Sequence, residues 1–118
     1  MSQRILNSSV EVRRLSSAEA ELWVAVAVET VAADTELRGR FIGPRCPGVS
    51  TVEVAYPLRP IQSPASLPPN TLLARAFIPE PNLWTEATPY IYEGRLELWQ
   101  EGTLVETAAV IVGLKQPR

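Results

Sequence analysis

The sequence predicts an all-β protein built as an antiparallel sandwich, because apolar and polar residues alternate with a period of two along much of the chain. The clearest alternation spans residues 22–28, where every second side chain is Leu or Val. Residues 52–56 repeat the pattern, and in residues 92–98 charged side chains occupy every second position. A helix would turn these positions to different faces, so strict alternation indicates strands with one buried face each.

Weaker alternation predicts four further strands, over residues 10–15, 36–42, 72–78 and 104–114. Residues 15–21 are interpreted as the loop between the first two strands, and residues 43–48 as a turn cluster rich in glycine and proline. Glu101 and Gly102 predict a hairpin turn in which the glycine supplies the positive φ. About seven short strands joined by turns predict an immunoglobulin-like antiparallel β-sandwich.

A proline-rich stretch, residues 57–69, lies between the predicted strands of the two halves. It contains these prolines: Pro57, Pro60, Pro64, Pro68 and Pro69. Proline lacks the backbone donor and therefore excludes a helix or a central strand here. We interpret the stretch as an extended crossing connection within a single domain, residues 1–118, since no repeat or shift in composition marks a second one.

Composition excludes several classes of function. The chain has no histidine and a single cysteine, so it can form no Ser-His-Asp or Cys-His centre, no Cys/His zinc site and no internal disulfide. We predict no cofactor. The net charge of −2 provides no overall attraction for nucleic acid. Arg38, Arg40 and Arg45 could form a small basic face, but we interpret Arg38 and Arg40 as solvent-facing residues of a strand.

The start of the sequence lacks the apolar stretch of a secretory signal, and no run approaches the ~20 apolar residues that span a bilayer. We therefore expect a soluble cytoplasmic protein with no membrane partner. Cys46 is then reduced. Its place in the turn cluster beside Arg45 would expose the thiol and could make it somewhat reactive, but no histidine or second cysteine supports such a role, so we interpret it as a fortuitous loop cysteine.

The most informative segment is residues 77–115. Its notable residues are two prolines, a Leu-Trp pair, an Ile-Tyr pair, a hairpin glycine and a final Gly-Leu-Lys: Pro81, Leu83, Trp84, Pro89, Ile91, Tyr92, Gly102, Gly113, Leu114 and Lys115. Their order resembles the immunoglobulin-like sandwich domain of family-2 glycoside hydrolases, the group that contains β-galactosidases, β-glucuronidases and β-mannosidases. Lys115 departs from the arginine usual in that family, and lysine cannot make a planar bidentate contact.

The resemblance implies a structural role for these residues. Leu83 and Trp84 would close the open end of the sandwich, and Pro81 and Pro89 would set the corner. Tyr92 would begin a core strand, with its hydroxyl able to find a backbone partner. The catalytic glutamates of the family lie on a (β/α)₈ barrel, which needs ~200 residues or more, so no catalytic residue is transferred to this chain.

Several glutamates raise the question of acid–base chemistry: Glu80, Glu86, Glu93, Glu97 and Glu101. Glycosidic cleavage requires two carboxyl groups ~5–10 Å apart. Glu93 and Glu97 lie four residues apart on one face of a predicted strand, which separates them by ~13 Å. We interpret them as solvated residues flanking Arg95.

Trp23 and Trp99 fall on the outward-facing positions of their predicted strands. They could form a contact with a protein partner or a second copy, or a platform on which sugar rings stack. The alternative is that the chain's own loops cover them, or that the register is shifted by one residue.

The sequence therefore predicts a non-catalytic, stand-alone sandwich module similar to the linker domain of family-2 glycoside hydrolases, acting through protein contact or self-association. One alternative is a carbohydrate-binding module that uses Trp23 or Trp99. The other is an orphaned fragment of a larger hydrolase.

Overall fold

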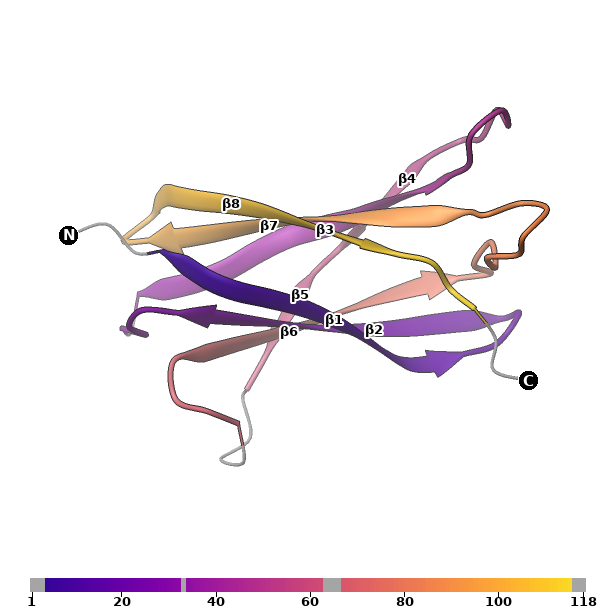
Figure 1. Cartoon of the computed structure of the whole chain (residues 1–118). Coiled ribbons are helices and arrows are strands. Elements are labelled where there is room, and N and C mark those ends of the chain that lie inside the picture. The colour runs from indigo at the N-terminus through magenta and orange to yellow at the C-terminus, as the bar shows by residue number, and fades with distance from the viewer. Residues whose placement is uncertain (1–3, 33, 63–66, 116–118) are drawn as a thin grey trace.

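The computed structural model describes residues 4–32, 34–62 and 67–115 of the chain. Within these residues it contains strands and no helix (Figure 1). The strands are β1 (Ile5–Leu15), β2 (Glu19–Val28), β3 (Thr35–Arg45), β4 (Val54–Pro57), β5 (Arg59–Ile61), β6 (Thr71–Pro79), β7 (Ile91–Gln100) and β8 (Thr103–Val112).

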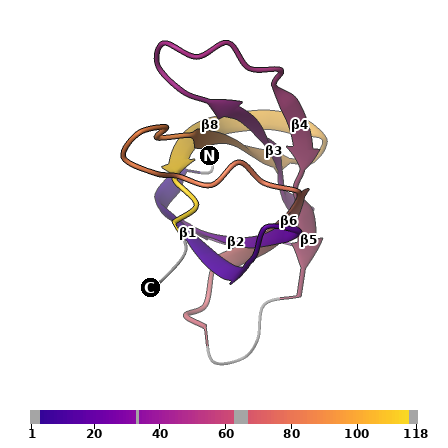
Figure 2. The same cartoon turned by 90° about the vertical axis from the view of Figure 1, so that its right-hand side faces the viewer.

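The strands form two four-stranded antiparallel sheets that face each other as layers (Figures 1 and 2). The first sheet has the order β1-β2-β6-β5 and the second the order β4-β3-β7-β8. This is the arrangement of an immunoglobulin-like sandwich in which an additional strand, β4, pairs with β3 at the edge of the second sheet. The predicted all-β sandwich is therefore confirmed.

The core lies between the two layers and consists of the inward-facing residues of both sheets. From the first sheet, Leu22, Val24 and Val26 on β2 are completely buried. Phe41, Leu96 and Leu98 meet them from the second sheet and are also completely buried. Each such side chain contributes roughly 1.5–3 kcal/mol by leaving water, so the alternation on these strands determines which face turns inward.

The chain crosses between the sheets just after residue 57. β4 pairs with β3 in the second sheet, and β5 pairs with β6 in the first. Leu58, between them, is buried, and its backbone N–H donates a 2.9 Å hydrogen bond to the carbonyl of Gly39. The sequence did not predict β5, because three residues are too few to show the alternation of a strand. Residues 63–66 of the proline-rich stretch, including Pro64, lie outside the described residues.

The prediction that residues 43–48 form a turn cluster is wrong for its first half. β3 continues to Arg45, because Gly43 pairs with Val54 of β4 and Arg45 pairs with Ile91 of β7. The pairing is irregular between Ile42 and Arg45, and the turn follows at residues 47–48. The local content of glycine and proline predicted a break in the strand, but the pairing of β3 with β4 on one side and with β7 on the other keeps residues 43–45 in the strand.

The predicted hairpin between the last two strands is confirmed. β7 ends at Gln100 and β8 begins at Thr103, which leaves a two-residue turn. Glu101 has a φ of 51° and Gly102 a φ of 74°, so both residues adopt the left-handed conformation that matches the twist of a hairpin.

Gly94 tests the packing of the second sheet. A methyl group at this position would lie 2.7 Å from Phe41 Cε1 and 2.7 Å from Val110 Cγ2, inside the core. We expect Gly94→Ala to lower the free energy of unfolding by roughly 1–3 kcal/mol through overpacking, as measured by urea denaturation. The control is Gly48→Asn, because nothing lies within 4 Å of that position and asparagine tolerates its φ of 75°. An equal loss of unfolding free energy in both variants would contradict overpacking at Gly94.

Candidate interaction surfaces

Trp23 lies on the outer face of the first sheet, between Glu11 of β1 and Arg75 of β6. Its ring is half-buried, and its indole N–H donates a 2.6 Å hydrogen bond to Glu21 Oε2. The Arg13 guanidinium carbon lies 4.1 Å from the ring centroid, a cation–π contact. One face of this indole is therefore already occupied by the chain itself.

Trp99 has the same surroundings on the outer face of the second sheet. Its indole N–H donates a 3.2 Å hydrogen bond to Glu97 Oε1, and the Arg38 guanidinium carbon lies 4.4 Å from its ring centroid. Arg38 is in turn paired with Glu36 at 2.7 Å. Glu36 lies directly opposite Trp99 in the strand pair of β3 and β7.

The two sites share one pattern: a Glu-x-Trp strand lies antiparallel to a Glu-x-Arg strand. The outward register of both tryptophans is as predicted, but arginines reduce their exposure: Arg13 covers Trp23, and Arg38, which was expected to face solvent, covers Trp99. The motifs Glu11-Val12-Arg13 and Glu36-Leu37-Arg38 are the sequence signals that could have identified the covering residues. The stacking depends on which strands are neighbours.

The arginines of residues 38–45 do not form a basic face. Besides the pair of Arg38 with Glu36, Arg45 forms ion pairs with Glu53 and Glu93. The hydrogen bond to Glu53 is the main cause that raises the pKa of Arg45. Acidic residues therefore offset the charge of two of these three arginines.

Glu93 bridges two arginines on the outer face of the second sheet. Its Oε1 accepts a 2.9 Å hydrogen bond from Arg95 and a 3.3 Å hydrogen bond from Arg45. The bond from Arg95 is the main reason that the pKa of Glu93 lies below its ordinary value, and the nearby charge of Arg45 acts in the same direction. A carboxylate held in its ionised form is a poor proton donor.

The other glutamates considered for acid–base chemistry have different environments. Glu97 accepts the hydrogen bond from Trp99, while Glu80, Glu86 and Glu101 are exposed. In the part of the chain that the structure describes, no group of three acidic, cysteine or histidine side chains is arranged to hold a metal ion. The same residues include no helix with the length and apolarity needed to cross a bilayer.

Tyr92 anchors the corner before β7. Its side chain is buried, with 1% exposed, and its hydroxyl accepts a 2.9 Å hydrogen bond from the backbone N–H of Asn82. This is the geometry of a tyrosine corner, in which a tyrosine early in the strand ties back to the preceding connection. Pro81 is buried, and Pro89 is half-buried in the same connection.

Trp84 packs on the segment that follows β8. Its backbone N–H donates a 2.9 Å hydrogen bond to the Leu114 carbonyl, and a methyl group at Gly113 would lie 2.8 Å from Trp84 Cδ1. The Lys115 ammonium lies 4.1 Å from the ring centroid. Leu83 packs against the core with the fully buried Leu114, whereas Trp84 itself is half-buried. The indole thus fixes residues 113–115 against the corner.

The prediction of an exposed thiol at Cys46 is wrong. Only 8% of the residue is exposed, because an isolated β-bridge between Cys46 and Val49 closes the turn around it. The Sγ atom lies 3.7 Å from the Pro47 carbonyl oxygen, to which it can donate a weak hydrogen bond. This placement gives the thiol little access to reactants.

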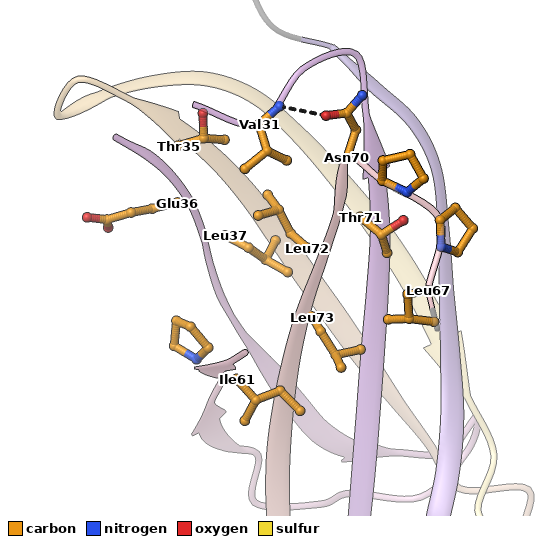
Figure 3. Close-up of a pocket in the computed structure, with 13 residues that line it drawn as sticks. Val31, Thr35, Glu36, Leu37, Ile61, Leu67, Asn70, Thr71, Leu72 and Leu73 are labelled. Atoms are coloured by element: carbon orange, nitrogen blue, oxygen red, sulfur yellow. Dashed lines mark hydrogen bonds between the residues drawn. The ribbon is translucent and has the colours of Figure 1, made fainter. Parts of the chain in front are cut away.

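Two depressions lie beside the proline-rich connection. The larger, of about 590 Å³, is lined mainly by apolar residues that include Leu37, Ile61, Leu67 and Leu72 (Figure 3). At its rim the Val31 N–H donates a 3.1 Å hydrogen bond to Asn70 Oδ1 (Figure 3). Its lining holds one charged residue, Glu36, so it offers no set of converging catalytic groups.

The smaller depression, of about 310 Å³, adjoins Trp23 on the outer face of the first sheet. Its lining combines Trp23 and Arg13 with Ser9, Glu11, Ala25, Leu67 and Leu73. Leu67, from the proline-rich connection, reaches this face of the sheet, and Leu73 is buried although it points outward. The chain's own connection therefore covers part of the surface beside Trp23.

A comparison with protein families matches residues 4–115 to Glycosyl hydrolases family 2. The chain belongs to this family. The match extends well beyond residues 77–115, on which the resemblance in the sequence was based. None of the curated proteins compared with the chain matches it significantly in sequence.

Solved structures of family-2 enzymes share the fold of this domain. A β-glucuronidase of Bifidobacterium dentium, complexed with coumarin-3-O-glucuronide, superposes with a TM-score of 0.64 at 16% identity, over 96% of this chain and 18% of that chain. A family-2 member from Bacteroides cellulosilyticus has a TM-score of 0.63 at 17% identity, over 95% of this chain and 14% of that one. A second β-glucuronidase has a TM-score of 0.56 at 13% identity, over 92% and 11%.

The chain thus spans less than a fifth of the length of these enzymes. At these identities the similarity establishes the fold of the family-2 domain.

The ion pairs of Glu93 predict a pH-dependent contribution to the stability of the family-2 domain. Because the folded-state pKa is lowered, the contribution is complete at pH values above the ordinary value of 4.5 and is lost as the pH falls through the folded-state pKa. We expect Glu93→Gln to be less stable than the wild type at pH 7 and the difference to shrink below pH 4.5. Denaturant titrations at several pH values measure this, and a constant difference down to the lowest pH would contradict it.

Proposed function

We propose that this family-2 domain is a non-catalytic module that acts through contact with protein, either a partner or a second copy. The observation that supports this most is that the two outward tryptophans and Glu93 are already engaged by arginines of the same chain. Arg13 and Arg38 cover Trp23 and Trp99, and Arg45 and Arg95 hold Glu93. Groups held in this way stabilise the sheets and are poorly disposed for bond cleavage.

The shape of the domain supports a spacing role similar to that of a linker domain. Its dimensions are 46 × 28 × 20 Å. β1 begins at one end of the long axis and β8 ends at the other (Figure 1). A domain entered and left at opposite ends separates whatever precedes it from whatever follows it. A barrel-encoding segment next to this one in the genome would favour the role of a piece of a larger hydrolase.

Two assays test the proposal. We expect the purified chain to release no product above the buffer rate from aryl β-glucuronides, β-galactosides or β-mannosides. The reason is that a non-catalytic module has no pair of carboxyl groups placed for acid–base catalysis. We also expect a fluorescently labelled chain to sediment faster than a monomer, either alone at high concentration or in an extract of its source cells. Unlabelled chain should compete with the labelled chain for this contact. Hydrolysis, or a monomer under both conditions, would contradict the proposal.

A second candidate function is sugar binding beside Trp23. The observation that favours it is the depression next to the indole, whose lining includes the polar residues Ser9, Glu11 and Arg13. If a sugar binds there, titration with a panel of glycans changes the tryptophan fluorescence of the wild type and of Trp99→Phe, but not of Trp23→Phe. A lack of response across the panel would exclude this function.

A further inference from the structure

We propose that the edge strand β8 is a self-association site, through which two copies of the chain pair along residues 107–112 and join their second sheets into one. This rests on the proposed function, because it identifies the surface and the partner of the protein contact. The proposal follows from a comparison of the four edges of the sandwich and from the residues that β8 presents.

Three of the four edges carry features that prevent pairing with another strand. β1 has two irregularities in its register and the charged residues Glu11, Arg13 and Arg14. β4 is four residues long and ends at Pro57, and β5 is three residues long and contains Pro60. Short strands, prolines, charges and bulges are the usual protections of sheet edges.

β8 is protected along its first half only. It is ten residues long and terminates the second sheet. Near its start the register shifts between Leu98 and Trp99, and Glu106 lies opposite the buried Leu98, on the side of the strand turned toward the core. A bulge together with an inward-facing charge discourages pairing there.

Residues 107–112 have none of these protections. Their sequence, Thr-Ala-Ala-Val-Ile-Val, contains no charge, proline or glycine and pairs regularly with β7. Ile111 is 62% exposed on the outer face. Among the described residues β8 forms a strand pair with β7 only, although β1 of the first sheet lies close to it. The side of β8 turned away from β7 therefore presents backbone N–H and C=O groups at every second residue.

The second copy is the occupant that this strand fits. An antiparallel pair with a two-fold axis at Ala109 places Thr107 opposite Ile111 of the partner subunit and Ala108 opposite Val110 of the partner subunit. Each copy's outward residues then stay on the outer face, and no like charges face each other. The small side chain at the centre permits the usual strand separation of about 4.8 Å.

Apart from Glu106, the nearest charges are those on the outer face of β7, and they do not oppose this contact. Glu93, Arg95 and Glu97 lie on β7, one strand away from the edge. In the proposed pair the two β7 strands are three strand spacings apart, about 14 Å. This distance exceeds the screening length of about 8 Å at physiological salt, so repulsion between the copies is small.

An edge-to-edge contact of one short strand buries less surface than the ~1,200–2,000 Å² of stable interfaces, so we expect a reversible dimer. Sedimentation equilibrium from ~10 μM to ~1 mM covers the dissociation constants of such weak complexes. Hydrogen exchange at both ends of this range should show that alternate amides within residues 107–112 gain protection as the dimer forms.

Three variants make the test specific. Ile111→Lys places a charge on the exposed side of the edge, and we expect at least a tenfold rise in the dissociation constant. Val52→Lys, at a residue that is 86% exposed and outside every strand, is the matched control and should dimerise like the wild type. Glu106→Thr removes the inward charge and should tighten the dimer. Circular dichroism and thermal unfolding verify that each variant is folded.

The results also separate this proposal from the proposed function. A wild-type chain that remains monomeric at ~1 mM overturns self-association at β8, whereas a complex in the cell extract would still support contact with a different protein. A dimer that Ile111→Lys leaves unchanged overturns the assignment to β8 but not protein contact. Loss of dimer in Ile111→Lys and Val52→Lys alike would indicate a general effect of charge and overturn it as well.

Discussion

The structure depends on the contact between the two inner faces of the sheets. Leu22, Val24 and Val26 of β2 are fully buried against a layer that includes Phe41 and Leu96. Because successive side chains of a strand point to opposite faces, burying these residues also determines which ones face outward. The positions of Trp23, Trp99 and Glu93 on the outer faces are therefore consequences of how the core is packed.

The outer faces are organised by pairs of oppositely charged groups around aromatic rings. In both sheets a tryptophan donates to a glutamate two residues before it and lies beneath an arginine of the neighbouring strand. Each exposed pair contributes little alone, and the arginine stems also cover apolar ring surface. This arrangement explains how a domain with aromatic residues on both outer faces can keep them from forming large exposed apolar patches.

The family relationship and the chemistry of the chain are consistent at the level of the domain. The corner formed by Tyr92, Asn82, Trp84 and Gly113 ties the connection before β7 to the segment after β8. These contacts fix the direction in which the chain leaves the sandwich. For a module proposed to act as a spacer or a contact surface, a fixed exit and an available edge strand matter more than a pocket.

The sequence by itself determined seven of the eight strands, the buried face of β2 and β7 and the hairpin at Glu101 and Gly102, because alternation and turn chemistry are local properties. It missed β5, and it assigned residues 19–21, the start of β2, to the preceding loop. The family resemblance followed from the order of residues between Pro81 and Lys115. Only the tertiary structure decided that β3 extends through Pro44, that Cys46 is buried and that Arg13 and Arg38 cover the two tryptophans. These features depend on which strands are neighbours, and residues far apart in sequence, such as Arg38 and Trp99, leave no periodic signal of their contact.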